Sequence, residues 1–299
     1  MSRPSFQPKG EDLRAAAWIY LSQAFLRGDE VRSNVKSEEP TFQRLTGFWE
    51  ADLKRTWQTK PGYTTCGDFV GHYSQSLGLG WISLLNTTDP RGYMKSLGRR
   101  MAWVGLESGL QPAYGDIFKQ VLPPLQHVGV SLDFDAGLWR TAEGGQGKPA
   151  EKWDAVRRKS SQQLTVANGI QGWVDIVVYQ EFKEENIAVP QWLIGVWEVS
   201  WPNQKYWYYF GADRYVYFIS TPSLLESFPF MSQGMGMFGV NANLVLTRWY
   251  GTGTIERFKI NPATKYALTG NVAGLPNPVF AEKIGTGSVF GAFSGKSTK

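Results

Sequence analysis

The single cysteine of the chain, Cys66, lies in the segment GYTTCGDFVGHY (residues 62–73), directly after two threonines. Thr65 is a suitable helix N-cap and Asp68 follows three residues later, which is a capping-box pattern. We therefore expect a helix from Cys66 to about Leu77. A cysteine in the first turn of a helix lies near unpaired backbone N–H groups, which favour its thiolate and can stabilise an oxyanion. Cys66 is thus a candidate nucleophile, and the alternative is an inert buried thiol.

A cysteine nucleophile needs a base, and the chain has only two histidines. His72 is six residues along the expected helix, about 120° and roughly 9 Å from Cys66, so we expect a surface or packing role. His127 begins the alternating segment HVGVSLDF, which is typical of a strand. Gly129 is next on the same face, which would leave room for a helix end. His127 is therefore the candidate base.

A third group should orient the imidazole ring. Asp133 is six residues further along an extended strand, about 20 Å away, and is too far. If DAG (residues 135–137) forms a three-residue turn, the next strand brings Glu143 diagonally beside His127 on the same face. A two-residue turn would shift the register by one residue and flip the faces, which favours Gln146. Glu143 is the first choice and Gln146 the second.

These segments together resemble the papain-like bacterial cysteine amidases of the CHAP and NlpC kinds. The matching elements are CGDFV at a helix start, YGDIF entering a sheet, HVGV beginning a strand and a polar residue on the next strand, within roughly residues 64–146. The resemblance implies that Cys66 attacks an amide carbonyl, His127 transfers the proton and Glu143 orients the ring. It also implies structural roles for Gly115 and Asp116.

The resemblance implies hydrolysis of amide bonds in peptidoglycan peptides. Asp68 replaces the glycine usual in the NlpC kind, Thr65 replaces a frequent aspartate, and EGGQG supplies a CHAP-like acid, so the subfamily and the bond cleaved stay open. Two contexts fit: an antibacterial effector of a contact-dependent system such as type VI secretion, with an immunity protein and a secretion-apparatus component as partners, or a phage endolysin. The alternative from another class is a non-catalytic two-domain binding protein.

The composition narrows the classes of protein. The 299 residues are 42% hydrophobic and carry a formal charge of +5, which supports folded structure and suits an anionic partner such as a bacterial wall. One cysteine excludes an internal disulfide framework and cysteine-rich zinc sites, and we expect no cofactor or metal. The basic run AVRRKSSQQ is more typical of a solvated face than of a nucleic-acid site, so we expect no nucleic-acid partner.

The N-terminal run AAAWIYLSQAFL (residues 15–26) has the length of a signal-peptide core. It is interrupted by polar residues and lacks a cleavage site, so we interpret it as a core helix. We therefore expect synthesis in the bacterial cytoplasm without a cleaved signal peptide and delivery to the periplasm of a target cell.

The pattern predicts an α+β protein with four parts. A papain-like hydrolase domain covers residues 1–182, with a loop over 28–40 and strands in the segments YGDIF, HVGVSLDF, LWRTAE and GWVDIVVYQEF. A linker (183–190), a β-barrel or sandwich domain (191–285) and a mobile Gly/Ser-rich tail (286–299) follow.

Within the second domain, YGTGT predicts a hairpin turn in which two glycines supply positive φ. GMGMFG (residues 234–239) matches a dinucleotide-binding fingerprint but lacks the surrounding βαβ unit, so we interpret it as a flexible loop. The dense aromatic residues suit either a sugar-stacking surface or an ordinary barrel core. A binding or targeting module is our hypothesis for this domain.

Overall fold

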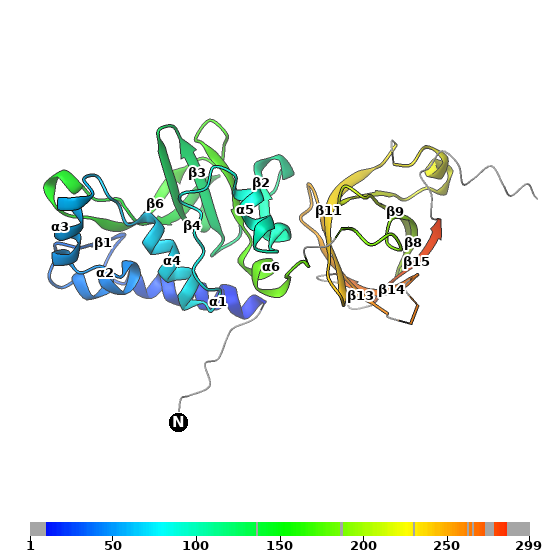
Figure 1. The fold of residues 1–299 in the computed structure, drawn as a ribbon, viewed down its shortest axis with the longest axis horizontal. Coiled ribbons are helices and arrows are strands. Elements are labelled where there is room, and N and C mark those ends of the chain that lie inside the picture. Colours follow the sequence, from blue (N-terminus) through cyan, green and yellow to red (C-terminus); the bar gives the residue numbers. More distant parts are fainter. Residues whose placement is uncertain are drawn as a thin grey trace, which may run out of the picture. The chain divides into compact units, whose positions relative to one another are not determined.

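The computed structural model describes residues 10–135, 137–185, 188–229, 231–261, 263–264, 266–272 and 278–285. The chain forms two compact units, Met1–Glu107 with Gln111–Glu181, and Ser108–Leu110 with Phe182–Lys299 (Figure 1). The predicted tail (286–299) lies outside the described residues, as does part of the predicted linker. None of the described helices is long and apolar enough to cross a lipid bilayer.

The first unit is an antiparallel sheet of seven strands in the order β1-β6-β5-β4-β3-β7-β2, with helices packed around it (Figure 1). Its strands are β1 (Glu30–Arg32), β2 (Trp103–Gly105), β3 (Ile117–Leu122), β4 (Leu125–Asp135), β5 (Leu138–Glu143), β6 (Ala155–Gln162) and β7 (Ile170–Val174). Its helices are α1 (Glu11–Ala24), α2 (Glu39–Thr46), α3 (Glu50–Thr59), α4 (Cys66–Ser76), α5 (Pro90–Ser96) and α6 (Ile176–Glu181).

Helices α1 and α4 are fixed to the sheet by polar contacts as well as by apolar packing. Arg14 of α1 donates to Asp116 Oδ1 at 2.9 Å and to the Tyr114 carbonyl at 2.7 Å. The Tyr73 hydroxyl of α4 donates to the Gly115 carbonyl at 2.8 Å. Since α4 also contacts β4 directly, the start of this helix is held close to the strand that carries His127.

Several predicted elements of the first unit were wrong. The predicted loop 28–40 contains the edge strand β1 and the start of α2, and the basic run 155–163 is strand β6, which pairs with β5. The strand predicted over 172–182 ends at Val174. Asp175 Oδ1 then accepts the N–H groups of Val177 and Val178 and caps α6, which stops the strand.

The second unit is a closed barrel of eight antiparallel strands, in the order β10-β11-β12-β13-β14-β15-β8-β9. The strands are β8 (Gly195–Trp201), β9 (Gln204–Phe210), β10 (Tyr215–Ile219), β11 (Gly234–Val240), β12 (Leu244–Trp249), β13 (Ile255–Ile260), β14 (Ala267–Val272) and β15 (Val279–Gly285). The fold is therefore a barrel and not a sandwich. The predicted YGTGT turn is confirmed, since Gly251 and Gly253 have φ of 77° and 71°.

GMGMFG is strand β11 and not the flexible loop that we predicted. Residues 234–237 pair with β10 and residues 236–240 pair with β12, so every residue of the strand is paired on at least one side. A Cβ at Gly236 would lie 2.4 Å from the Arg248 carbonyl oxygen, so this glycine allows close approach of two strands. The glycines reflect barrel packing and not nucleotide binding.

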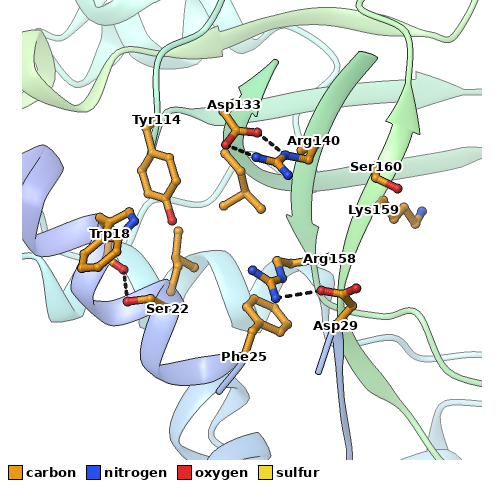
Figure 2. Close-up of a pocket in the computed structure, with 12 residues that line it drawn as sticks. Trp18, Ser22, Phe25, Asp29, Tyr114, Asp133, Arg140, Arg158, Lys159 and Ser160 are labelled. Atoms are coloured by element: carbon orange, nitrogen blue, oxygen red, sulfur yellow. Dashed lines mark hydrogen bonds and ion pairs between the residues drawn. The ribbon is translucent and has the colours of Figure 1, made fainter. Parts of the chain in front are cut away.

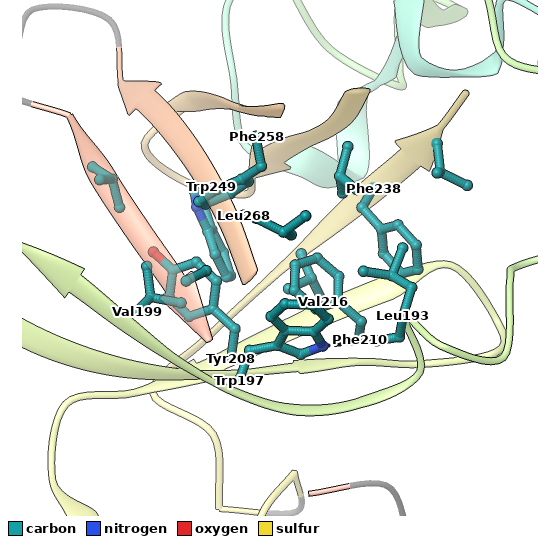
Figure 3. Close-up of a cluster of buried hydrophobic side chains, with 14 of the residues drawn as sticks. Leu193, Trp197, Val199, Tyr208, Phe210, Val216, Phe238, Trp249, Phe258 and Leu268 are labelled. Carbon is teal, nitrogen blue, oxygen red and sulfur yellow. Dashed lines mark hydrogen bonds between the residues drawn. The ribbon is translucent and has the colours of Figure 1, made fainter. Parts of the chain in front are cut away.

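The barrel interior is filled largely by its own apolar side chains (Figure 3). Trp197 packs edge-on against Phe210, and Phe210 packs edge-on against Phe238, with ring centroids 6.2 and 5.0 Å apart. These aromatic residues are thus barrel core, the second of the two interpretations, whereas Trp207 and Phe228 are buried in a separate cluster. One end of the barrel is less completely filled, as described below.

Candidate active site

Cys66 is the first residue of α4, as the sequence predicts, and is 2% exposed. The predicted capping box is wrong, because Thr65 makes no side-chain cap. Its backbone N–H and its hydroxyl each donate at 3.0 Å to Asp154 Oδ2, a buried carboxyl after the loop beyond β5. The Asp68 carboxylate accepts instead from the Tyr63 hydroxyl. Asp154 therefore fixes the helix start, and no sequence motif identified it.

His127 and Glu143 are adjacent, as the sequence predicts. The Nε2 atom of His127 lies 2.8 Å from Glu143 Oε2. The predicted three-residue turn is wrong, since Asp135 is opposite Leu138 and Phe134 is opposite Trp139.

A β-bulge between Ser131 and Phe134 corrects this shift of register. Beyond it, Ser131 is opposite Thr141 and Val130 is opposite Ala142, which is the pairing that the three-residue turn would have produced. The turn is one residue shorter than predicted, and the bulge adds one residue to β4, so the two changes cancel. Glu143 consequently reaches the face of the sheet that carries His127.

Gln146, the second choice, also lies beside the imidazole. Its Nε2 is 3.5 Å from His127 Nε2 and donates to Glu143 Oε2 at 3.2 Å. The Glu143 carboxylate makes the shorter contact with the ring. Gln146 therefore contacts both members of the pair while Glu143 orients the imidazole.

The Glu143 carboxylate is fully buried and receives several donors. Thr141 donates through its hydroxyl to Oε1 at 2.6 Å, and Lys159 Nζ lies 2.7 Å from Oε2. Lys159 belongs to β6, the segment that the sequence analysis assigned to a solvated basic face. Lys159 is opposite Thr141 in the strand register. The segment AVRRKSSQQ does not alternate between apolar and polar residues, so the sequence carried no signal that places Lys159 at the site.

The pKa values of the three groups are shifted in directions that favour a charged site. Burial raises the pKa of the Cys66 thiol, but the hydrogen bond and charge of His127 outweigh it and the net pKa is lowered. Burial lowers the pKa of His127, while its bonds to Cys66 and Glu143 raise it to about 9. Burial raises the pKa of Glu143, while His127 and Lys159 lower it to about 2. Near neutral pH this arrangement favours a thiolate beside an imidazolium.

Two glycines directly after β5 let the chain approach the start of α4 closely. A Cβ at Gly144 would lie 2.7 Å from the Thr65 carbonyl oxygen, and one at Gly145 would lie 3.2 Å from the Cys66 nitrogen. The space beside Gly129, which we expected to receive the helix end, is occupied by the Phe118 ring and by Glu143. The close approach therefore occurs at EGGQG and not at HVGV.

The other singled-out residues have structural contacts. The His72 ring packs edge-on against Trp81, with centroids 5.2 Å apart, which fits the predicted packing role. Asp133 pairs with Arg140. Gly115 has φ of 89° and accepts from Tyr73, while Asp116 is 2% exposed and binds Arg14.

Lys119 is a buried cation near the site that the sequence analysis did not identify. Its Nζ donates to the Leu85 carbonyl at 2.5 Å and to Gln126 Oε1 at 2.6 Å, and the Leu85 side chain covers Gly67. Burial lowers the pKa of Lys119 to about 8, and the nearby Cys66 opposes this shift. Lys119 thus fixes the segment that covers the first turn of α4.

Of the hollows on the described part of this unit, two adjoin the elements discussed above. One, of about 400 Å³, lies between α1 and the sheet (Figure 2), where Arg140 pairs with Asp133 and Arg158 with Asp29. The other is a groove of about 620 Å³. It is lined by Lys54, Trp57, Gln58, Pro61, Gly62, Pro149, Ala150 and Lys152. The groove lies on the segments that lead into Cys66 and out of Gln146.

Comparison of the chain with protein-family models, with curated proteins and with solved structures finds no match.

Proposed function

We propose that the protein is a cysteine-dependent hydrolase in which Cys66 is the nucleophile, His127 the general base and acid, and Glu143 the residue that orients the imidazole. The observation that supports this most strongly is the contact of His127 Nε2 with the buried Glu143 carboxylate beside a helix-start cysteine. The second ring nitrogen is left for the thiol, whose pKa the imidazole lowers. These are the three roles that thiol acyl transfer requires.

The chemistry follows from these positions. The Cys66 thiolate attacks an amide carbonyl carbon, forming a C–S bond, and the carbonyl oxygen becomes an oxyanion. The backbone N–H groups of the first turn of α4 are candidates to stabilise that oxyanion. As the C–N bond breaks, the imidazolium of His127 gives its proton to the leaving amine. A water molecule deprotonated by His127 then cleaves the thioester and regenerates the thiol.

The proposed substrate is an amide bond of a peptidoglycan peptide, as the resemblance to CHAP and NlpC enzymes implies. The groove beside the site supports a peptide ligand, since Gly62 is four residues before Cys66 and Pro149 three residues after Gln146. Extended chain spans at most ~3.6 Å per residue, so the groove begins within about 14 Å of the nucleophile. Lys54 and Lys152 in its lining suit the carboxylates of such peptides.

The proposed context is an antibacterial effector made in the bacterial cytoplasm and delivered to the periplasm of a target cell, with the barrel unit as a binding or targeting module. The net charge of +5 suits an anionic wall. An immunity protein and a secretion-apparatus component are the partners that this context implies.

The proposal is tested by digesting purified peptidoglycan of several chemotypes with the full chain and with Cys66→Ala. Mass spectrometry of the soluble fragments then identifies the bond cleaved. We expect fragments from the wild type only. A wild type that releases nothing while its Cys66 has the reactivity of an ordinary thiol would favour the non-catalytic binding protein.

If the wild type releases nothing although Cys66 is reactive, the proposed hydrolase chemistry stands and the proposed peptidoglycan substrate is wrong. His127→Ala and Glu143→Ala separate the roles. We expect the first to abolish the measurable rate, and the second to lower it by about 10²-fold or more because the ring is no longer oriented.

A further inference from the structure

The barrel unit has a cavity of about 220 Å³ at one end, next to the filled core. It is lined by Trp201, Tyr206, Tyr208, Phe218, Gly234, Met235, Trp249, Tyr250, Thr252 and Thr254. These residues come from the end of β8, the start of β9, the end of β10, the start of β11 and the hairpin after β12. In an antiparallel barrel these positions share one rim, so the cavity is a mouth of the barrel.

The rings around this mouth pack edge-to-face in a continuous series. Trp201 meets Tyr206 with centroids 5.3 Å apart, Tyr206 meets Phe218 at 5.7 Å, and Phe218 meets Trp249 at 5.2 Å. Their interplanar angles are 65°, 85° and 86°. A further flat ring inserted among them would gain the same edge-to-face contacts.

The chemistry of the lining selects the class of ligand. Every lining residue is aromatic, Gly, Met or Thr, so no lining side chain is charged at neutral pH. The Tyr208 hydroxyl already donates to the buried Glu256 carboxyl at 2.7 Å. A charged group would lose its hydration here without compensation.

One glycine shapes this mouth. A Cβ at Gly234 would lie 2.3 Å from Phe218 Cε1, so only glycine lets the Phe218 ring lie across β11 where it lines the cavity. Gly234 is directly opposite Phe218 in the strand register. The position of the Phe218 ring in the series therefore depends on Gly234, the residue paired with it.

We propose that this mouth binds a neutral, flat, apolar ring system of about two fused rings. A dry cavity of about 150 Å³ holds benzene, so one of this volume suits an indole- or naphthalene-sized group. Polar substituents of the ligand would lie at the rim, beside Thr252 and Thr254. The proposal is independent of the chemistry proposed for Cys66.

The test is a titration of the full chain with 5-fluoroindole, followed by ¹⁹F NMR, in competition with naphthalene methanol and with n-octanol. We expect saturable binding that naphthalene methanol displaces and that n-octanol displaces only weakly. Phe218→Ala and Gly234→Ala should each weaken binding about tenfold or more, since both remove the Phe218 ring from the series.

Phe280→Ala is the matched control, because Phe280 is an aromatic residue of the same barrel, 54% exposed and outside the cavity lining. It should leave the affinity within twofold. Thr254→Phe, which fills the rim, provides a second variant if a core substitution prevents folding. The proposal is overturned by absence of saturable binding, by equal loss in Phe280→Ala, or by stronger displacement with n-octanol, which would indicate an acyl-chain site.

Discussion

Glu143 shows how a fully buried carboxylate can stay ionised. Burial alone would raise its pKa, but His127, Thr141, Lys159 and Gln146 all direct hydrogen-bond donors at its two oxygens. Donors and positive charge favour the ionised form, and the pKa is lowered to about 2. The anion in turn helps to hold His127 protonated, with a pKa of about 9. The charge state of the site therefore depends on a network and not on three residues alone.

The reactivity of the Cys66 thiol should depend on His127. Because its pKa is lowered chiefly by His127, the rate of alkylation by iodoacetamide should reach its plateau below the pH at which an ordinary thiol ionises. In His127→Ala the burial of the thiol is opposed only by its hydrogen bonds with Thr64 and the Gly67 backbone, and the midpoint should move up by at least about one pH unit. Mass spectrometry of the single-cysteine chain measures the rate directly. Equal midpoints in the two proteins would contradict the contact between Cys66 and His127.

A second prediction concerns Lys159, whose ammonium lies 2.7 Å from Glu143 Oε2. Lys159→Met removes a charged donor from a buried carboxylate and should lower the free energy of unfolding by about 1–3 kcal/mol at pH 7. Urea unfolding measures the loss. The matched control is Lys148→Met, because Lys148 makes its ion pair with Glu151 on the surface, where both side chains are more than half exposed. Similar losses in both variants would show that Lys159 has no special role.

The stability contributed by this cluster has a defined pH window. His127 has a raised pKa, so its contribution is complete below about pH 6.5 and is lost as the pH rises through about 9. Glu143 has a lowered pKa, so its contribution is complete above about pH 4.5 and is lost as the pH falls through about 2. The contribution of this cluster should therefore be greatest between about pH 4.5 and 6.5. Urea unfolding of His127→Ala should show the decline above pH 6.5 largely removed.

Among the helices and strands, those with a strong local sequence pattern could be predicted. The start of α4 at Cys66 was predicted correctly, although the threonine cap on which the prediction rested does not form, and the alternation of HVGVSLDF gave the strand that carries His127. Contacts distant in sequence could not be predicted. Thr65 is capped through Asp154, 89 residues away, in place of the local pattern with Asp68.

The β4–β5 hairpin shows the same limit. The prediction of Glu143 beside His127 was correct, although the turn on which it rested was not, because a bulge in β4 compensates the shorter turn. Bulges have no reliable sequence signature, so register near them depends on side-chain packing across the sheet. The β11 strand was missed because its glycines serve close strand packing, which only the barrel partners reveal.

A third prediction tests the loop that follows β5. Gly145 and Gly137 both have positive φ, 71° and 80°, so alanine costs about 1–2 kcal/mol of backbone strain at either position. Only at Gly145 would the added Cβ also meet Thr64, at 2.9 Å, whereas a Cβ at Gly137 meets no atom within 4 Å. Gly145→Ala should therefore lose more stability in urea and should also slow alkylation of Cys66. If Gly137→Ala slows alkylation equally, the loop does not position the thiol.

The molecule has two units with separate cores, so we expect the stability of each unit to depend on pH in its own way. The first unit contains the His127 and Glu143 cluster. The barrel contains the buried carboxyl of Glu256, which accepts hydrogen bonds from the hydroxyl groups of Tyr208 and Thr247 at 2.7 and 2.9 Å. Burial raises the pKa of Glu256, and these hydrogen bonds only partly oppose it. The barrel should therefore lose stability as the pH rises through the weakly acidic range, where the His127 and Glu143 cluster contributes a constant amount.

The sign of the barrel response follows from linkage. The native barrel holds the Glu256 proton above the pH at which the unfolded chain releases it, about pH 4.3. Unfolding then releases a proton, so the free energy of unfolding of the barrel falls as the pH rises toward the raised pKa.

Glu256→Gln stays neutral, keeps an acceptor for the neighbouring hydroxyl groups, and should remove this decline between pH 4.5 and 7. The exposed barrel carboxylate Glu282, changed to Gln, should leave it intact. Pulse proteolysis in urea, with fragments assigned by mass spectrometry, reports each unit separately. A Glu256→Gln barrel whose decline matches that of the wild type would show that the native carboxyl is already ionised, stabilised by its two hydroxyl donors despite its burial.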